Sequence, residues 1–121
     1  MAKIKTGDLT GPALDWAVQE IEYQRMVAEG EHVKQWVLDD HRAGSCSAHY
    51  STDWLWGGPL LNQHKISRTI DHSGLWIAYA GYNLNDEQRH MQCDRSELVA
   101  GLRCLVALNL GEVVDVPEEM L

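Results

Sequence analysis

The first long hydrophobic pattern of the chain has the period of a helix. Its apolar residues recur at i, i+3, i+4 and i+7, the spacing of one helix face: Leu14, Ala17, Val18 and Ile21. We therefore expect a helix from Leu9 to about Glu29. Thr10 or Gly11 would cap its start, Pro12 would lie in its first turn, and Gly30 would end it.

The middle of the chain alternates between apolar and polar stretches. Residues Lys34 to Leu38 predict a strand, and the polar stretch from Asp39 to Ser47 predicts a loop. The run Tyr50–Pro59 then combines hydroxyl groups, aromatic rings and a Gly-Gly-Pro break. We expect Ser51 or Thr52 to cap a short helix there, and the proline to restart a helical turn.

The pattern of the second half predicts two paired strands. Ile66–Ile70 and Leu75–Ala80 are apolar runs separated by Asp71–Gly74, which is a hairpin signal. Residues 81–95 are polar and irregular, and the stretch has the length of a functional loop.

A last helix is expected between a serine cap and a glycine stop. Ser96 would cap this helix and Gly111 would end it. Its buried face would be formed by Leu98, Leu102, Leu105 and Val106. Val113–Val116 then predicts a short strand or extended tail, closed by Pro117.

This order of elements favours an α+β fold. We expect a small, mostly antiparallel sheet of three to four strands, packed with two main helices and one short helix. A chain of 121 residues fits one domain over residues 1–121. A domain of this size buries roughly two-thirds of the surface that its unfolded chain exposes.

Composition limits the classes of partner. Hydrophobic residues make up 45% and charged residues 23%, as in ordinary soluble domains, and we expect no membrane association or signal peptide. The formal net charge of −8 repels phosphate backbones, so we expect no nonspecific nucleic-acid binding. Cys46, Cys93 and Cys104 show no CxxC spacing and are expected as free thiols in a reducing cytosol.

The run Tyr50–Pro59 is the densest group of side chains that could bind a ligand. Capping groups and glycines leave backbone N–H groups for an anion, and tryptophan faces suit a flat ring. The simpler interpretation is that the run only starts, anchors and ends a helix. The residues that we expect in a ligand pocket are Tyr50, Ser51, Thr52, Asp53, Trp54, Gly57, Gly58, Trp76 and Arg103.

Sequence motifs give little support for catalysis. The chain has no Gly-x-Ser-x-Gly motif, and no cysteine has a histidine at a recognised spacing. Ser51 and Asp53 would need a base from elsewhere, such as His49 or His64. We expect no catalytic residues, and the chain is more consistent with a protein that is not an enzyme.

Histidine and cysteine spacing offers one weak zinc pattern. His41, Cys46 and His49 could combine with His90 and Cys93, but neither spacing is that of a zinc finger. We expect these side chains to be solvated, and no metal or cofactor to be bound.

Arg103 is the most informative single charge. It shares a helix stripe with Val99, Val106 and Leu110, so its guanidinium lies beside apolar residues. A half-buried guanidinium requires a carboxylate or phosphate partner. The structural interpretation is an ion pair with one of three carboxylates: Asp53, Asp15 or Asp115. The functional interpretation is a contact with a ligand phosphate.

Several segments of the chain resemble one family of phage proteins. They are Ala13–Val18, Tyr50–Trp54 with Gly57–Pro59, Trp76–Ala78, and Gly101–Glu119. In order and spacing they are similar, over nearly the whole chain, to the NinX family of small accessory proteins of lambdoid and related phages. The resemblance implies a phage or prophage protein that works in the cytoplasm of an infected bacterium. It implies no particular activity, because the family has none assigned.

Two functions follow from these observations as hypotheses. The first is a protein that binds a small anionic, nucleotide-like molecule, and that sequesters a nucleotide-derived host immune signal without turnover. The alternative is an acidic, DNA-mimic-like protein that binds and inhibits a host protein.

Trp54 and Trp56 are two residues apart, about 200° around a helix, so one should face the core and the other a surface. Trp16 lies off the core stripe of the first helix, and Leu108 and Leu110 exceed what one sheet face requires of the last helix, so we further predict a homodimer or higher oligomer.

Overall fold

The structure, a computed structural model, describes residues 1–80 and 90–121. Its elements in chain order are β1 (Ala2–Lys5), η1 (Thr6–Asp8), α1 (Gly11–Ala28), α2 (Gln35–Ala43), α3 (Trp54–Gln63), β2 (Ile66–Ile70), β3 (Trp76–Ala80), β4 (Gln92–Asp94), α4 (Glu97–Leu110), β5 (Val113–Val116) and η2 (Glu118–Met120). The described residues thus form four α-helices and two small antiparallel sheets, which confirms the predicted α+β fold class.

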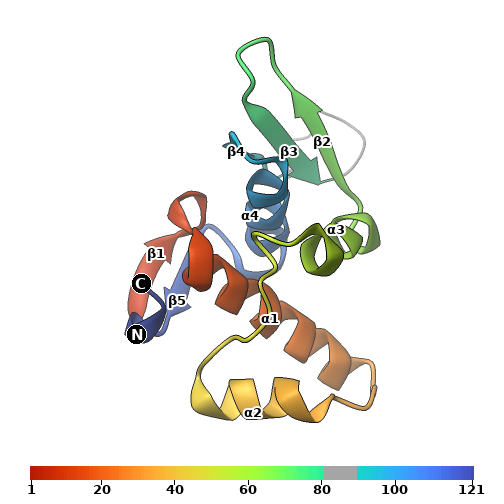
Figure 1. Cartoon of the computed structure of the whole chain (residues 1–121), viewed down its shortest axis with the longest axis vertical. Helices are drawn as coiled ribbons and strands as arrows, with labels where there is room; N and C mark the ends of the chain where they lie inside the picture. The colour runs from red at the N-terminus through yellow and green to blue at the C-terminus, as the bar shows by residue number, and fades with distance from the viewer. Residues whose placement is uncertain (81–89) are drawn as a thin grey trace.

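Helix α4 lies at the centre of the molecule. It packs against all three strands β2, β3 and β4, and also against α1 and α3 (Figure 1). Its inward face is completely buried and includes Leu102, Cys104, Leu105 and Val106. Gly101 allows α3 to approach closely, because an added Cβ would lie 2.7 Å from a methyl group of Leu61. The core is therefore built around one helix near the end of the sequence.

The strongest sequence signals are confirmed. Helix α1 follows Thr10, with proline in its first turn and Gly30 in the left-handed conformation just beyond its end. The Oγ of Ser96 accepts a hydrogen bond from the Val99 N–H at 3.2 Å, which is the predicted cap of α4. Helix α4 ends at Gly111, whose φ of 96° few other residues adopt easily.

The predicted hairpin is also confirmed. Strands β2 and β3 pair in antiparallel register, with Ile66 opposite Ala80 and Ile70 opposite Trp76. Their connection is held by Asp71, whose carboxylate accepts hydrogen bonds from the backbone N–H groups of Ser73 and Leu75.

The strand predicted at Lys34–Leu38 is wrong, and so is most of the loop predicted after it. Residues Gln35–Ala43 form helix α2, which lies beside α1 (Figure 1). The single buried apolar side chain Val37 and the buried Asp40 lie three residues apart, on one helical face. Tertiary contact with α1 therefore decided the conformation of a segment whose residue types favour a strand.

Two strands were not predicted. β1 pairs with β5 to form a two-stranded sheet, which joins the two ends of the described chain (Figure 1). β4 adds to β3 within the region predicted to be an irregular loop. Both are short, at four and three residues, and neither pattern is long enough to signal a strand alone. Residues 81–89 of that predicted loop lie outside the described residues.

None of the helices among residues 1–80 and 90–121 combines the length and the hydropathy that a bilayer span requires.

Candidate functional site

An aromatic cavity lies between α1, the start of α2 and α3. Its volume is about 160 Å³. It is lined by Gln19, Glu22, Met26, Lys34, Trp36, Val37, Tyr50, Trp56 and Leu60. These residues come from four separate segments of the chain, so only the folded protein forms the cavity. We call it the aromatic cavity below.

Three aromatic rings, two of which contact the third, line the aromatic cavity. The ring centroids of Trp36 and Trp56 lie 5.6 Å apart at an interplanar angle of 83°. Those of Tyr50 and Trp56 lie 6.2 Å apart at 87°. Edge-to-face pairs of this kind are the favourable arrangement for aromatic quadrupoles. Trp56 is the central ring, and 43% of its surface is exposed.

A buried carboxylate lies at the same cavity. Glu22 is 5% exposed. Its Oε2 accepts a hydrogen bond from Nε of Arg25 at 3.1 Å and forms an ion pair with Nη2 of Arg25 at 3.0 Å. Its Oε1 lies 3.3 Å from Nε2 of His64. Burial by itself raises the pKa of Glu22, but the contacts with His64 and Arg25 together hold that pKa below its ordinary value. Glu22 is therefore ionised at neutral pH.

The run Tyr50–Pro59 is divided between core, cap and surface. Tyr50 and Ser51 are buried, whereas Thr52, Asp53 and Trp54 are exposed. Asp53 caps α3 by accepting a hydrogen bond from the Leu55 N–H at 2.9 Å, so the prediction of a Ser51 or Thr52 cap is wrong. The proline does not restart a helical turn, because α3 runs through it without a break.

The hydroxyl of Ser51 is the one buried side-chain polar atom of the described residues without a hydrogen-bond partner. Its backbone N–H is engaged, since it donates to Oδ1 of the buried Asp15 at 2.7 Å. Asp15 thus fixes the chain at the entry to α3.

The two glycines of the run lie in close packing contacts. A Cβ added to Gly57 would lie 2.3 Å from the Tyr50 carbonyl oxygen and 2.9 Å from a methyl group of Leu98. A Cβ added to Gly58 would lie 2.9 Å from the ring of Trp54. These distances give both glycines a structural reason that requires no bound anion.

Arg103 has a different partner from those predicted. Its Nε donates to the Leu9 carbonyl at 2.7 Å, and its Nη1 donates to the Cys93 carbonyl at 3.2 Å and to Oδ1 of Asp94 at 3.1 Å. The proposed pairing with Asp53, Asp15 or Asp115 is therefore wrong. The Arg103 side chain is 11% exposed and joins α4 to β4 and to the chain that enters α1.

The structure places the nine predicted site residues in different environments. Tyr50 is the one of the nine that lines the aromatic cavity. Trp76 lies on β3, opposite Asp94 of β4, and packs partly buried against the core. Trp36, Glu22 and Lys34 of the cavity were not predicted. A helical interpretation of residues 35–43 would have placed Trp36 beside α1, but no pattern in the sequence marked Glu22.

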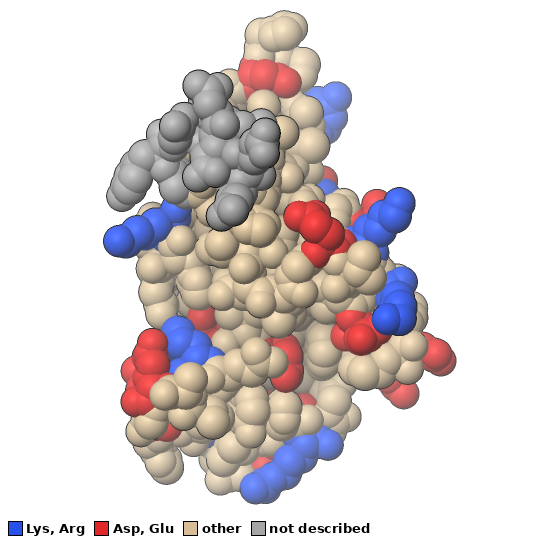
Figure 2. Space-filling view, turned by 180° about the vertical axis from the view of Figure 1, so that it is seen from behind, with Lys and Arg blue, Asp and Glu red and all other residues tan. Residues whose placement is uncertain are grey.

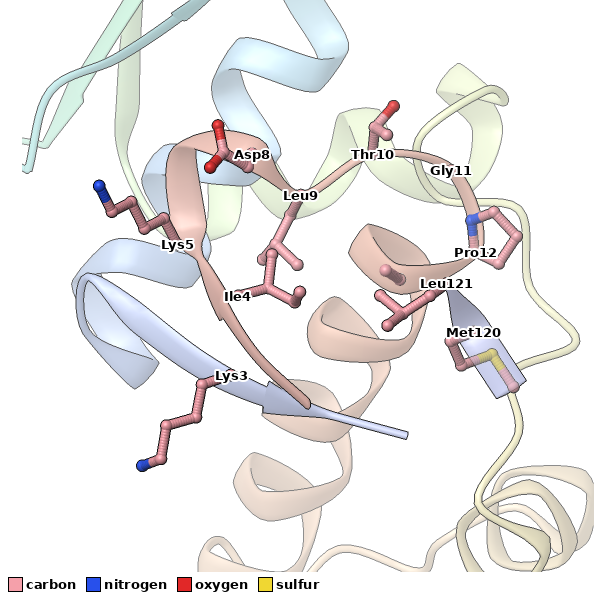
Figure 3. Close-up of a pocket in the computed structure, with 11 residues that line it drawn as sticks. Lys3, Ile4, Lys5, Asp8, Leu9, Thr10, Gly11, Pro12, Met120 and Leu121 are labelled. Atoms are coloured by element: carbon pink, nitrogen blue, oxygen red, sulfur yellow. The ribbon is translucent and has the colours of Figure 1, made fainter. Parts of the chain in front are cut away.

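A larger groove lies near the two ends of the chain and has a volume of about 570 Å³. We call it the N-terminal groove. It is lined by residues 3–5, 8–13, 120 and 121. Ile4, Leu9 and Leu121 extend toward the same space within it (Figure 3). Its walls are thus mainly apolar.

Two of the residues weighed as zinc ligands, His41 and Cys46, have other contacts. His41 stacks on Tyr23 with ring centroids 3.8 Å apart, and Cys46 donates to the carbonyl of Ala48. No group of three or more His, Cys, Asp or Glu side chains that could hold a metal ion occurs within residues 1–80 and 90–121. Burial raises the pKa of the Cys46 and Cys104 thiols to about 12, which keeps both protonated at neutral pH.

Comparison with known proteins gives one family. The family model described as Bacteriophage P22, NinX matches residues 5–109, which include every residue of the aromatic cavity. No curated protein matches the sequence. Because the match spans far more than half of the 121 residues, the chain belongs to the phage NinX family.

Proposed function

We propose that this protein is a phage accessory protein that binds a small ring-bearing ligand of nucleotide type and holds it without turnover. The proposed binding site is the aromatic cavity. The observation that carries the proposal is the convergence of three aromatic rings and one ionised carboxylate on this cavity.

The size of the cavity limits what enters it. Pockets that enclose a whole drug-sized ligand measure about 300–1,000 Å³. The aromatic cavity, at about 160 Å³, accommodates only the ring of such a ligand. The rest of the molecule would remain at the mouth, where Trp56 is partly exposed. A planar ring that stacks on one indole face gains stacking energy and buries apolar surface.

Charge gives the site its polarity. The carboxylate of Glu22 would accept hydrogen bonds from N–H groups on the edge of a nucleobase-like ring. Lys34 lines the same cavity and would meet a phosphate outside the ring pocket. The two groups therefore favour a ligand with a hydrogen-bond-donating ring at one end and an anion at the other.

The lining residues support binding in preference to turnover. Among the described residues, none that lines the cavity is a serine, threonine or cysteine. Burial raises the pKa of the Tyr50 phenol, which keeps it protonated and a weak nucleophile. Sequestration of a nucleotide-derived host immune signal would be one use for such a binder. That use rests on membership of a phage family and not on any contact in the structure.

Thermal shift with a ligand panel tests this proposal. The panel contains cyclic dinucleotides, ADP-ribose derivatives and NAD. A ligand present at about 100 times its Kd should raise the free energy of unfolding by about 2.7 kcal/mol. Trp56→Ala should abolish the shift, because it removes the central ring. Trp54→Ala is the matched control, since Trp54 is similarly exposed, at 48% against 43%, but does not line the cavity.

Equal loss of the shift in both tryptophan variants would contradict the proposed site. A shift of less than one degree across the panel at millimolar ligand would contradict ligand binding itself.

A second function is favoured by the surface beside the cavity. Trp54 and Leu55 are 48% and 81% exposed at the start of α3, which suits a protein-binding surface. The acidic DNA-mimic form of this idea requires a continuous acidic surface. On the face in Figure 2, acidic and basic side chains form small separate groups around a broad uncharged area. A stoichiometric host protein lost on Leu55→Ala, without any small-molecule shift, would favour this function.

A further inference from the structure

The N-terminal groove lies beside an open strand edge. β1 pairs with β5 on one side, and no described strand pairs with β1 on the other. The groove is lined by Lys3, Ile4 and Lys5 of this strand (Figure 3). An unpaired edge displays backbone donors and acceptors that can hydrogen-bond to another strand.

The register of the β1–β5 pair shows which backbone groups face the open edge. In an antiparallel pair, residues that hydrogen-bond to the partner alternate with residues whose N–H and C=O point away from it. The Thr6 N–H donates to the Glu112 carbonyl at 2.9 Å, which continues the β1–β5 register by one pair. Ile4 therefore bonds toward β5, and the N–H groups of Lys3 and Lys5 point toward the open edge.

The side chains of β1 define the partner that would fit. Ile4 is partly buried against the core and extends into the groove, whereas Lys3 and Lys5 are exposed and point away from it (Figure 3). An added strand would present apolar side chains on the Ile4 face and acidic side chains on the lysine face. β5 already shows this complement, because Asp115 lies opposite Lys3 with Oδ1 3.9 Å from Nζ.

We propose that β1 is a docking edge for an extended segment of another protein, in which apolar and acidic residues alternate. The segment adds a third strand to the β1–β5 sheet, and its apolar side chains fill the groove of about 570 Å³. Pairing of β1 with β1 of a second copy is disfavoured, because lysines would face lysines across the new pair. This inference is independent of the aromatic cavity.

Proline substitution tests the backbone contact directly. Lys5 has φ −63° and ψ 134°, so proline fits its conformation, and its N–H is not needed for the pairing with β5. The probe is a fluorescein-labelled octapeptide of alternating valine and glutamate, followed by fluorescence polarisation. Lys5→Pro should weaken probe binding about tenfold, because it removes both a backbone hydrogen bond and the charge of the lysine. Lys5→Ala, which keeps the N–H, should weaken it about threefold or less.

Modified peptides keep the test valid if Lys5→Pro does not fold. An octapeptide with N-methyl groups on every residue cannot donate backbone hydrogen bonds along either edge, and it should bind the unaltered protein at least about tenfold more weakly. A valine–lysine octapeptide should also bind more weakly, because its charge matches that of β1. Hydrogen exchange of the Lys3 and Lys5 amides should slow when the valine–glutamate peptide is added.

Three outcomes of the peptide-binding experiments would overturn the proposal. They are the absence of probe binding at millimolar peptide, equal binding of the N-methylated peptide, and equal binding by Lys5→Pro and Lys5→Ala. A dimer in light scattering that Lys5→Pro converts to monomer would also overturn it, since a second copy would then occupy the edge.

Discussion

At the scale of single residues, close packing explains features that resemble a ligand-binding motif. The Gly-Gly pair of α3 suggests an anion cradle in the sequence, but Gly57 meets the Tyr50 carbonyl and Gly58 meets the Trp54 ring. The two glycines differ in the group that an added methyl would displace. At Gly57 the neighbour is backbone, and at Gly58 it is an exposed side chain that can move.

Alanine substitution should therefore lower the stability of the protein at Gly57 but leave it nearly unchanged at Gly58. Gly57→Ala should lower the free energy of unfolding by about 1–3 kcal/mol or more, because the backbone of Tyr50 cannot yield without moving α3. Gly58→Ala should be near neutral, since the gain in helix propensity of about 1 kcal/mol offsets displacement of the Trp54 ring. Urea unfolding measures both. A large loss at Gly58 with none at Gly57 would contradict the packing described here.

Asp40 is a second residue whose role can be tested alone. It is 8% exposed, and it accepts hydrogen bonds from Gln19, from Ser45 and from the N–H and hydroxyl of Ser47. Burial by itself raises the pKa of Asp40, but these hydrogen bonds outweigh it and lower that pKa. Asp40 thus holds the loop after α2 against α1.

Because the pKa of Asp40 is lower in the folded state, its ionised form stabilises the fold above the unfolded-state pKa. This contribution is lost as the pH falls through the folded-state pKa. Asp40→Asn should cost about 1–3 kcal/mol at pH 7. The difference from the unaltered protein should shrink as the pH falls below about 4. Thermal melts from pH 7 to pH 3 measure this, and a constant difference across that range would contradict it.

At the scale of elements, Arg103 connects three segments. Its side chain on α4 bonds to β4 through Asp94 and Cys93, and to the chain before α1 through Leu9. Asp53 instead caps α3. The two residues expected to form an ion pair therefore stabilise different parts of the fold.

Double-mutant cycles separate these roles. Arg103→Met should cost about 1–3 kcal/mol, because the Leu9 carbonyl loses its partner, and Asp53→Ala should cost about 1 kcal/mol as a lost cap. The two losses should add within about 0.5 kcal/mol. Arg103→Met and Asp94→Asn should instead couple, because these residues are in contact. Chemical unfolding gives each value, and coupling between Asp53 and Arg103 would contradict the arrangement.

At the scale of the whole molecule, the exposed apolar surface bears on self-association. Of the three residues that suggested an oligomer, Trp16 and Leu110 pack partly buried against the core, while Leu108 is 39% exposed. Trp54 and Leu55 provide a more exposed surface on α3. The predicted homodimer would bury this surface.

Light scattering tests the oligomer. We expect a mass above the 13.7 kDa of one chain at tens of micromolar protein, and a return to that mass on Leu55→Glu. Val27→Glu is the control, because Val27 is also an exposed apolar side chain, at 55%, but belongs to α1. A mass of 13.7 kDa for the unaltered protein would end this prediction.

The sequence by itself determined the elements that local chemistry specifies. Helix α1 has a full apolar stripe and a proline start, α4 has its serine cap and glycine stop, and the hairpin has its Asp-containing turn. Each signal lies within a few residues of the structure that it produces, so the chain carries it without help from distant contacts. The family resemblance came from segments of these elements and from the run Tyr50–Pro59, and it is confirmed.

Only the tertiary structure decided the features that depend on distant partners. Segment 35–43 became a helix because it packs on α1, and β1 became a strand because β5, more than a hundred residues away, pairs with it. The aromatic cavity joins Glu22, Trp36 and Trp56 from three helices, and Arg103 found Asp94 and not Asp53. Such pairings depend on which surfaces the folded chain brings together, and the residues on either side carry no local signal of them.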